Sequence, residues 1–352
     1  MKVFSTSNTD LQAISSDLKA SLPNKPTFIL YFHSSGFDGA AVGAAIAKAF
    51  PGVPALGCST AGEIVTGKML DGSLVVAGFD ADEIPRAEIV EIVGDDIKAA
   101  LSTLTGRYSQ VEYNTHVGLI LMDGLSGKEE SLMESLGDST ELTFVGGSAG
   151  DDLKFVKTSV AVNGKVITGP GAMALLYVPG GFDLIKTQSF CTTGKTLTPT
   201  RVDRKTRAVL EFDGKPAAQA YAEAVGVTSV GEAANAFMTN PLGLMAGDEP
   251  FVRSPQRIDG DKVHFYCSVH EGVELAVLKG QNIVADTEKA LSQTQFRSLI
   301  VFNCILRTLD LKNQGKTEAF GKLFTKPTIG LSTYGEAFIG HINQTATILA
   351  LR

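Results

Sequence analysis

The sequence lacks most of the features that mark a specialised class of protein. It has no tryptophan, and its cysteines (Cys58, Cys191, Cys267 and Cys304) are too widely spaced for a C-x-x-C pair or a zinc site. The five histidines form neither H-x-x-x-H nor H-E-x-x-H. A disulfide framework and an obligate protein-ligated metal site therefore have no support, although a metal could still arrive inside a cofactor.

Basic residues and long apolar runs are also missing. The chain has 31 Lys and Arg against 38 Asp and Glu, a net charge of -7, and no basic cluster that would suit nucleic acid. No stretch approaches the ~20 apolar residues of a membrane span, and the N-terminus lacks the apolar core of a signal peptide. We expect a cytoplasmic protein with neither nucleic acid nor membrane as a partner.

What is present is the composition of a folded protein. The chain has 352 residues, 44% of them hydrophobic and 20% charged, and no low-complexity tract. This length is enough for two domains, each with its own core.

Glycine-rich turns recur along the chain. The stretch "GCSTAGE" (57–63) is echoed by "GLSTYGE" (330–336), and both fit G-x-S-T-x-G-E. A second type occurs as "GGSAGDD" (146–152) and "GLMAGDE" (243–249). The order of the two types indicates two diverged copies, and we predict domains at residues 1–200 and 201–352.

The segments before these turns favour an α/β fold. Short apolar runs at 27–34, 116–124 and 298–304 are typical of strands buried on both faces, and each is followed by a candidate amphipathic helix. A fourth unit would combine "RAVLEF" with "KPAAQAYAEAV", and the Asn163-Gly164 pair predicts a hairpin. We predict α/β domains with mixed sheets and flanking helices, built from repeated β-α-β units that end in acidic turns.

A G-x-S-T-x-G turn can direct several backbone N–H groups and two hydroxyls at one point, which would hold an anion. Glu63 or Glu336 beside it would suit the ammonium group of a zwitterion. The alternative is that the glycines allow close packing of a helix on a sheet, and that the acids are helix caps or exposed charges.

Signatures of an enzyme are weak. Cys58 has no local histidine as its base, "GCSTA" departs from the G-x-S-x-G nucleophile elbow at Ala61, and neither a P-loop nor a dinucleotide-binding turn occurs. Leu331 stands in the echo where Cys58 stands in the first turn, which favours a packing role for Cys58. We predict no catalytic residue. His33, at the end of an apolar run, and His341, beyond the last turn, could ligate a haem iron or bind a ligand.

The motifs together resemble the FIST sensory proteins, named for F-box and intracellular signal transduction. The resemblance rests on "GCSTAGEI", "VGGSAGDDLKF", "EFDGKPAAQAY", "VFNCILR" and "IGLSTYGEAFIGHINQT", in the order of a FIST N and a FIST C domain. The family's H-N-x-T pattern is interrupted here by Ile342.

The resemblance implies a ligand sensor that signals through a separate protein. Amino acids are the ligands proposed for many members, whereas the NosP branch binds b-type haem, senses nitric oxide and regulates a histidine kinase or a cyclic-di-GMP enzyme. We predict that a ligand binds between the two halves of the chain. On these grounds the predicted ligand-binding residues are Gly57, Cys58, Ser59, Gly62, Glu63, Gly147, Ser148, Asp151, Arg307, Ser332, Tyr334, Glu336, His341 and Asn343, with His341 and His33 as the candidate haem ligands.

Two other classes stay open. One is a hydrolase or transferase that uses Cys58 or Ser59. The other is a structural interaction module in which the turns only pack the repeats.

Overall fold

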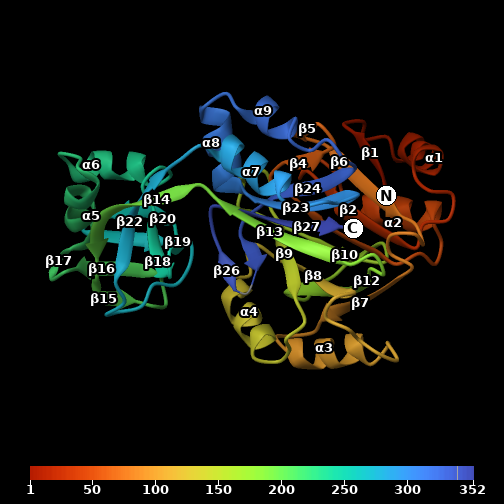
Figure 1. Ribbon diagram of the computed structural model, residues 1–352, viewed down its shortest axis with the longest axis horizontal. Helices are drawn as coiled ribbons and strands as arrows, with labels where there is room; N and C mark the ends of the chain where they lie inside the picture. Colours follow the sequence, from red (N-terminus) through yellow and green to blue (C-terminus); the bar gives the residue numbers. More distant parts are fainter. Residues whose placement is uncertain (339) are drawn as a thin grey trace. The chain divides into compact units, whose positions relative to one another are not determined.

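Packing divides the chain into two compact units (Figure 1). The structure is a computed structural model, and it describes residues 1–338 and 340–352. The first unit comprises Met1–Thr187, Thr287–His341 and Ala346–Arg352, and the second comprises Gln188–Asp286 and Ile342–Thr345. The predicted boundary at residue 200 stays a prediction about sequence domains, because the first unit also takes in Thr287–His341 and Ala346–Arg352 from the C-terminal part of the chain.

Three six-stranded sheets run through the described part of the first unit. The first has the order β1 (Lys2–Thr6), β6 (Leu74–Phe79), β2 (Phe28–His33), β3 (Ala55–Ser59), β10 (Val160–Val162) and β11 (Lys165–Val166). The second has the order β7 (Arg86–Ile92), β12 (Gly171–Tyr177), β8 (His116–Met122), β9 (Phe144–Ser148), β25 (Glu336–Phe338) and β26 (His341–Ile342). The third has the order β13 (Phe182–Gln188), β27 (Thr345–Leu351), β23 (Ser298–Cys304), β24 (Thr328–Thr333), β4 (Glu63–Val65) and β5 (Lys68–Leu70).

The three sheets follow one pattern. Each contains a parallel pair, β2 with β3, β8 with β9, or β23 with β24, and we call these pairs repeats 1, 2 and 3. An antiparallel strand, β6, β12 or β27, flanks the first strand of each pair. The hairpin that follows each pair joins a different sheet: β4–β5 extends repeat 3, β10–β11 extends repeat 1, and β25–β26 extends repeat 2. The repeats therefore form a closed cycle of exchanged hairpins.

The register of the exchange is the same in all three repeats. Val160 pairs with Cys58, Glu336 with Gly147, and Glu63 with Leu331, and each partner follows the first glycine of its turn. That glycine lies close to the neighbouring strand: a Cβ atom on Gly146 would lie 1.8 Å from the carbonyl oxygen of Ile120. The glycines of these turns thus allow close packing, but against the neighbouring strand of the same sheet rather than between a helix and a sheet as predicted.

Helices cover the outer faces of the sheets. Aspartates at 10, 38 and 96 accept backbone N–H bonds at the starts of the first three. Val42 and Ile46, on the predicted apolar face, are buried in a cluster with Ile29 and Tyr31 of β2. The helices are α1 (Leu11–Ser21), α2 (Gly39–Ala49), α3 (Ile97–Thr105), α4 (Glu129–Gly137), α7 (Ile283–Ser292), α8 (Ile305–Asn313) and α9 (Thr317–Gly321).

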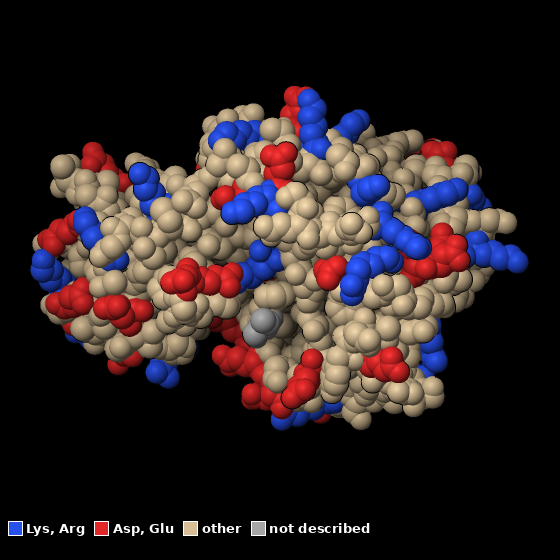
Figure 2. All heavy atoms as spheres, viewed as in Figure 1, with Lys and Arg blue, Asp and Glu red and all other residues tan. Residues whose placement is uncertain are grey.

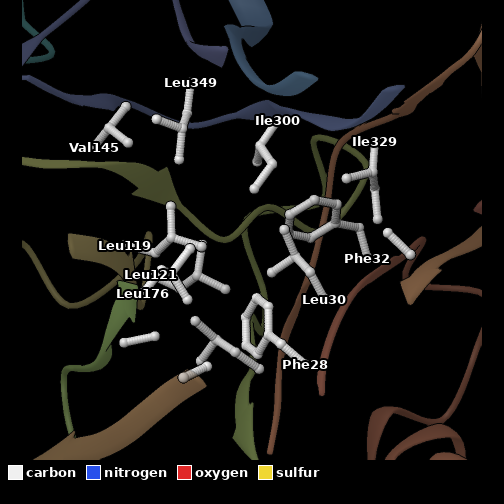
Figure 3. Packing of buried hydrophobic residues seen from close by; sticks show 14 of the residues in the cluster. Phe28, Leu30, Phe32, Leu119, Leu121, Val145, Leu176, Ile300, Ile329 and Leu349 are labelled. Carbon is white, nitrogen blue, oxygen red and sulfur yellow. The ribbon is translucent and has the colours of Figure 1, made fainter. Parts of the chain in front are cut away.

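The inner faces of the three sheets share one hydrophobic core (Figure 3). Phe28, Leu30 and Phe32 of β2 point into this core, as do Leu119 of β8 and Ile300 of β23. Because Ile29 and Tyr31 of β2 face the helices instead, the strand is apolar on both sides, as its unbroken hydrophobic run predicts. Each such side chain contributes roughly 1.5–3 kcal/mol through burial.

The second unit has a different, antiparallel architecture. One sheet has the order β14 (Phe190–Leu197), β22 (Leu275–Gly280), β18 (Leu242–Ala246) and β19 (Glu249–Arg253). The other has the order β15 (Pro199–Asp203), β16 (Ala208–Phe212), β21 (Lys262–Phe265) and β20 (Pro255–Asp259), with β17 (Lys215–Pro216) beside β16. The helices α5 (Ala217–Val225), α6 (Val230–Ala233) and a 3-10 turn, η1 (Ala234–Ala236), belong to this unit.

The predicted mixed α/β fold with repeated β-α-β units is confirmed. Three of the predicted units lie in the first compact unit, but the predicted fourth does not form a parallel pair. "GLMAGDE" forms the tip of the antiparallel β18–β19 hairpin, where Gly247 has a φ of 61°. "RAVLEF" and "KPAAQAYAEAV" do form β16 and α5, but β16 pairs only antiparallel with its described neighbours. A shared glycine-acid motif serves a hairpin as well as a strand end, because both need a permissive backbone.

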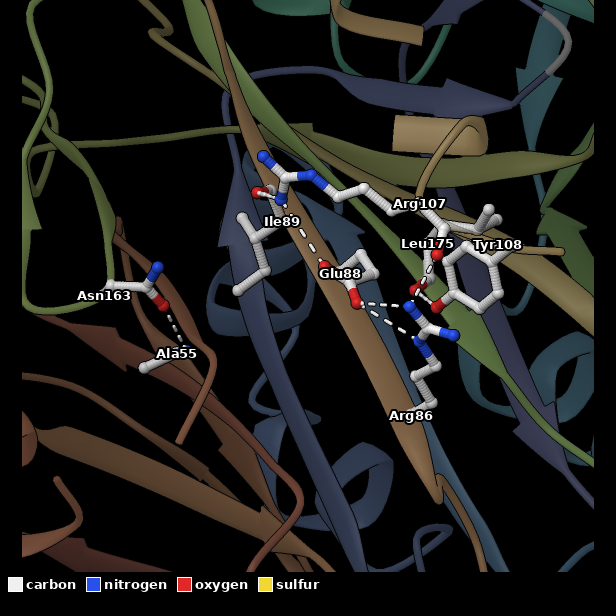
Figure 4. Close-up of polar contacts among 8 residues, drawn as sticks. All are labelled: Ala55, Arg86, Glu88, Ile89, Arg107, Tyr108, Asn163 and Leu175. Atoms are coloured by element: carbon white, nitrogen blue, oxygen red, sulfur yellow. Dashed lines mark hydrogen bonds and ion pairs between the residues drawn. The ribbon is translucent and has the colours of Figure 1, made fainter. Parts of the chain in front are cut away.

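The predicted Asn163-Gly164 turn joins β10 and β11, with positive φ at both residues. The Asn163 side chain accepts a hydrogen bond of 3.0 Å from the backbone N–H of Ala55, which ties this hairpin to β3 (Figure 4). On β7, an exposed network in the same figure links Arg86 to Glu88 at 2.9 Å.

Candidate functional site

The three turns interlock through their own backbones. In each repeat, the backbone of a serine near the end of the second parallel strand forms hydrogen bonds with the segment that follows another repeat. The three serines are Ser59, Ser148 and Ser332. Their N–H groups donate to the carbonyls of Ser159, Gly335 and Gly62, respectively, and their carbonyls accept from the N–H groups of Gly150, Tyr334 and Ala61, respectively. These amides therefore already have partners within the protein.

The two glutamates of the G-x-S-T-x-G-E turns are fully buried. Glu63 accepts a 2.5 Å hydrogen bond from the Thr60 hydroxyl and a 3.0 Å bond from the backbone N–H of Ser73. Glu336 accepts the equivalent 2.6 Å bond from Thr333. Burial raises the pKa of Glu63 to about 8, even though both hydrogen bonds act to lower it. Each buried glutamate therefore stabilises its own turn through a hydrogen bond from the threonine of that turn.

Repeat 2 is followed by a much longer connection. Residues 60–62 lead from β3 to β4 and residues 334–335 from β24 to β25, whereas residues 149–159 lead from β9 to β10. Val160 of β10 occupies the register position of Glu63 and Glu336. We call residues 151–157 the long loop.

Asp151 organises the long loop. Its carboxylate accepts backbone N–H bonds from Phe155, Val156 and Lys157 at 2.6–2.9 Å and a 2.5 Å bond from the Tyr334 hydroxyl. Burial acts to raise the pKa of Asp151, but these four hydrogen bonds hold it below its usual value. Asp151 is therefore an ionised anchor whose oxygens are engaged by the loop itself.

Tyr334 clamps the same loop from the third repeat. Its hydroxyl oxygen accepts the N–H groups of Asp151 and Leu153 at 3.2 and 2.9 Å, and its ring stacks on Phe155 at 5.0 Å. Asp152, Leu153 and Phe155 have φ values of 57°, 64° and 51°, a left-handed conformation that costs of order 1–3 kcal/mol per residue. The clamp and the Asp151 carboxylate hold the loop in this strained form.

A cavity of about 420 Å³ lies between the long loop and the ends of β2 and β3. Because β2 and β3 are parallel, it opens at their carboxyl ends, the usual position for ligands in α/β sheets. Its polar lining is formed by His33, Ser35, Asp38, Ser59, Asp151, Lys154, Lys157 and Ser159, and its apolar lining includes Phe37, Ala40, Val156 and Val166.

His33 offers an acceptor to this cavity. Burial lowers its pKa despite the hydrogen bond to Ser34 and the nearby Asp152 and Asp38. In the neutral ring Nδ1 donates to the carbonyl of Ser34 at 3.0 Å, so Nε2 carries the lone pair. A Cβ atom on Gly39 would lie 2.9 Å from Nε2, so a glycine at the start of α2 makes room for the imidazole.

Both signs of charge meet at the cavity. The exposed residues Lys157 and Asp38 both line it, and Asp38 caps the start of α2. The Lys154 ammonium donates to the Ser35 hydroxyl at 2.7 Å, and this hydroxyl donates to Asp152 at 2.5 Å. The Ser59 oxygen accepts the N–H of Ser159 at 2.9 Å, which leaves the Ser59 proton free to donate.

The predicted site residues fall into distinct places. Ser59, Asp151 and His33 line the cavity. Gly57, Cys58, Gly147, Ser148 and Ser332 lie in β3, β9 and β24, Gly62 and Tyr334 lie in turns, and Glu63 and Glu336 are buried at the starts of β4 and β25. His341 packs on Gly335 in the first unit, and Asn343 belongs to the second unit. Ligand contact by these residues stays a prediction.

Cys58 is a core residue. Its side chain is 1% exposed within the central hydrophobic cluster, and burial raises the pKa of its thiol. A nucleophilic thiolate is disfavoured there. The packing role predicted for this residue agrees with its position.

Arg307 lies in a buried network rather than in the cavity. Its guanidinium donates to Asn303 at 3.1 Å and to the hydroxyls of Thr187 and Thr287 at 3.2 and 3.0 Å. Asn303 of β23 occupies in repeat 3 the register position that His33 occupies in repeat 1, because Asn303 pairs with Ser332 and His33 pairs with Ser59. The same position therefore holds an open cavity in one repeat and a filled polar core in another.

Sequence reasoning missed Ser35, Asp38, Lys154, Lys157 and Ser159. For Lys154, Lys157 and Ser159 the signal was the length of "DDLKFVKTS" between the acidic turn and the next strand, since the hairpin starts directly after the turn in the other two repeats. The sequence does not show that the hairpins are exchanged between repeats, and so it could not predict that this segment and His33 line the same cavity.

Comparison with known families accounts for nearly the whole chain. A FIST N domain matches residues 27–215, and a FIST C domain matches residues 217–339. The chain belongs to the FIST family. FIST domains are sensory domains, so this protein carries a sensory domain of signal transduction.

A relative in Methanocaldococcus jannaschii, described as uncharacterized protein MJ1623, is 28% identical over 183 residues, which are 48% of this FIST chain. The match covers 34% of that relative, so the chain spans about a third of its length. No described helix of the FIST protein combines the length and apolar character needed to cross a membrane.

Proposed function

We propose that this FIST protein senses a small zwitterion of the amino-acid class in the cavity beside His33. The observation that carries the proposal is the meeting of both charge signs at the carboxyl ends of β2 and β3. Lys157 and the Ser59 hydroxyl supply donors for a carboxylate. The lone pair of His33 and the carboxylate of Asp38 supply acceptors for an ammonium group.

The proposal makes the protein a sensor without catalytic activity. This proposal is favoured by the described hydrogen bonds, which join Ser59 to Ser159 and His33 to Ser34, so that none of them holds a base against the Ser59 hydroxyl. The output would pass to a separate partner, for which a cytoplasmic histidine kinase or cyclic-di-GMP enzyme is our proposal.

A haem group fits the residues of this cavity poorly. Haem needs an apolar slot beside its axial ligand, but the walls around His33 carry Lys154, Lys157 and Asp38. The other candidate ligand, His341, packs tightly on Gly335, where a Cβ atom would lie 2.1 Å from its Cε1. We therefore derive no step through haem, and nitric oxide sensing stays a prediction from the family resemblance.

The test is a thermal-shift screen of the free amino acids followed by calorimetric titration of those that stabilise the protein. We expect Lys157→Gln to weaken binding about tenfold or more, since a hydrogen bond to a charged group contributes about 1.5–3 kcal/mol. Lys48→Gln is the matched control, because Lys48 is an exposed lysine in the last turn of α2 and does not line the cavity.

Two outcomes would contradict the proposal. Equal affinities of the Lys157 and Lys48 variants would place the ligand elsewhere. A Soret band in protein expressed with added haem, together with no stabilisation by any amino acid, would favour the haem alternative.

A further inference from the structure

The cavity beside His33 carries more negative than positive charge. The charged residues that line it are two lysines and two aspartates: Lys154, Lys157, Asp38 and Asp151. Asp152 adds a third carboxylate, because it accepts hydrogen bonds from the backbone N–H and the hydroxyl of Ser35, which also lines the cavity. Hydrogen bonds from neutral groups leave the charge of a carboxylate in place. Three carboxylates therefore face two ammonium groups.

Neighbouring charges do not cancel this excess. The start of α2, which Asp38 caps, contributes only a partial positive charge of roughly half a unit. Lys165 precedes the lining residue Val166 on β11, and successive side chains of a strand point to opposite faces, so Lys165 points away from the cavity. Asp123, which accepts the Thr158 hydroxyl just after the long loop, adds to the negative side. The local balance therefore stays negative.

The rest of the chain adds the same sign. Acidic and basic side chains are interspersed on the face drawn in Figure 2, and the whole chain has a net charge of -7. A cationic ligand is therefore attracted both by the protein as a whole and by the cavity.

The buried end of the cavity offers an acceptor to such a ligand. His33 is 3% exposed, and its Nε2 atom, which lies beside the lining residue Gly39, makes no hydrogen bond among the described residues. Burial is the largest influence on the pKa of the ring and lowers it, whereas the charges of Asp152 and Asp38 both act to raise it. A cation at this end would therefore meet an unused lone pair in a negative potential.

We propose that the ligand is a basic amino acid, whose side chain ends in an ammonium or guanidinium group. The inference rests on the proposed zwitterion site: the α-carboxylate and the α-ammonium group add no net charge, so only a cationic side chain offsets the negative excess. Charges act over several ångströms in a partly enclosed cavity, where they are screened less than in water. An acidic side chain would enlarge the excess, and a neutral one would leave it uncompensated.

The test compares ligands of similar shape that differ in side-chain charge: arginine with citrulline, and lysine with norleucine. Calorimetric titration should show at least about fivefold tighter binding of the charged member of each pair. Added NaCl should reduce this preference, because salt screens the charges. Lys157→Gln should weaken both members of a pair, since Lys157 binds the α-carboxylate that they share.

Two variants should change the preference in opposite directions. Asp38→Asn removes a negative charge but keeps a residue that caps helices, so the ratio of arginine to citrulline affinity should fall at least about threefold. Lys154→Gln removes a positive charge and should raise that ratio. The matched controls are Asp17→Asn and Lys48→Gln, exposed residues of α1 and α2 that do not line the cavity, and they should leave the ratio unchanged. Circular dichroism melting checks that each variant is folded.

Equal affinities for arginine and citrulline, both weakened by Lys157→Gln, would overturn the inference and leave the zwitterion site standing. Tightest binding of glutamate or aspartate would also overturn it, as would a preference for arginine that Asp38→Asn and Asp17→Asn reduce equally. If no amino acid binds, the proposed function fails together with the inference.

Discussion

The turns after repeats 1 and 3 and the connection after repeat 2 solve the same structural problem in different ways. All three deliver a hairpin to the neighbouring sheet in the same register. The two short turns seal their junctions with a buried glutamate and a threonine hydroxyl. The long connection places Val160 at that position and leaves a cavity beneath residues 151–157. The candidate site therefore lies where the repeat departs from its own pattern.

The largest expected effect comes from removing the glycine that lets the two parallel strands of a repeat approach closely. Gly146→Ala would place a methyl group 1.8 Å from the carbonyl oxygen of Ile120, so the parallel strands of repeat 2 would have to separate. We expect a loss of at least about 3 kcal/mol in the free energy of unfolding, measured by urea denaturation.

Gly137→Ala is the control for this substitution. Gly137 ends α4 and has no atom within 4 Å of the added Cβ, so a change within about 0.5 kcal/mol is expected. Equal stability of the two variants would contradict the close packing of repeat 2.

The second prediction concerns the sealed turns. The folded pKa of Glu63, about 8, lies above its ordinary value of 4.5, so the folded state binds the proton more tightly. Stability should therefore fall as pH rises from about 5 to about 8, by on the order of 3 kcal/mol at about 1.4 kcal/mol per pKa unit.

Glu63→Gln should flatten this pH dependence, because glutamine stays neutral. Urea denaturation at several pH values measures it, with the exposed Glu134→Gln as the control. A slope unchanged by Glu63→Gln would show that another group titrates.

The open junction should respond to pH with the opposite sign. Hydrogen bonds hold the pKa of Asp151 below its usual value, so its contribution is present above pH 3.8 and is lost as pH falls through the folded pKa. Asp151→Asn should cost about 2 kcal/mol, because charge-assisted bonds to three N–H groups are weakened.

Hydrogen exchange should then show faster exchange at Phe155, Val156 and Lys157 in Asp151→Asn, with the amides of β2 and β8 unchanged. Protection of the loop amides equal to that of the wild type would refute the anchoring role of Asp151.

The smallest expected effect tests the difference between Ala61 and Tyr334, which occupy equivalent positions in two repeats. Ala61 and Tyr334 make the same backbone bond to a serine carbonyl, but only Tyr334 has a hydroxyl that clamps the long loop. Tyr334→Phe should cost about 1 kcal/mol and raise exchange at Leu153, whereas the exposed Tyr113→Phe should change neither. Loop protection that survives Tyr334→Phe would assign the clamp to ring stacking alone.

Local patterns predicted much of this architecture. The unbroken apolar runs identified β2, β8 and β23, the spacing of Val42 and Ile46 identified a helix face, and Asn163-Gly164 identified a hairpin. These features depend on neighbouring residues, so one sequence is enough to reveal them. The same reasoning misplaced the fourth repeat, because "GLMAGDE" has the glycine and acid of a strand end but forms a hairpin tip.

By itself, the sequence determined the class of fold, several of its strands and helices, and the family to which the chain belongs. Only the tertiary structure decided that the repeats exchange their hairpins, that Glu63 and Glu336 are sealed inside, and that Lys154 and Lys157 lie beside His33. The reason is physical: strand pairing between distant segments follows from how three sheets share one core, and no local pattern encodes which hairpin completes which sheet.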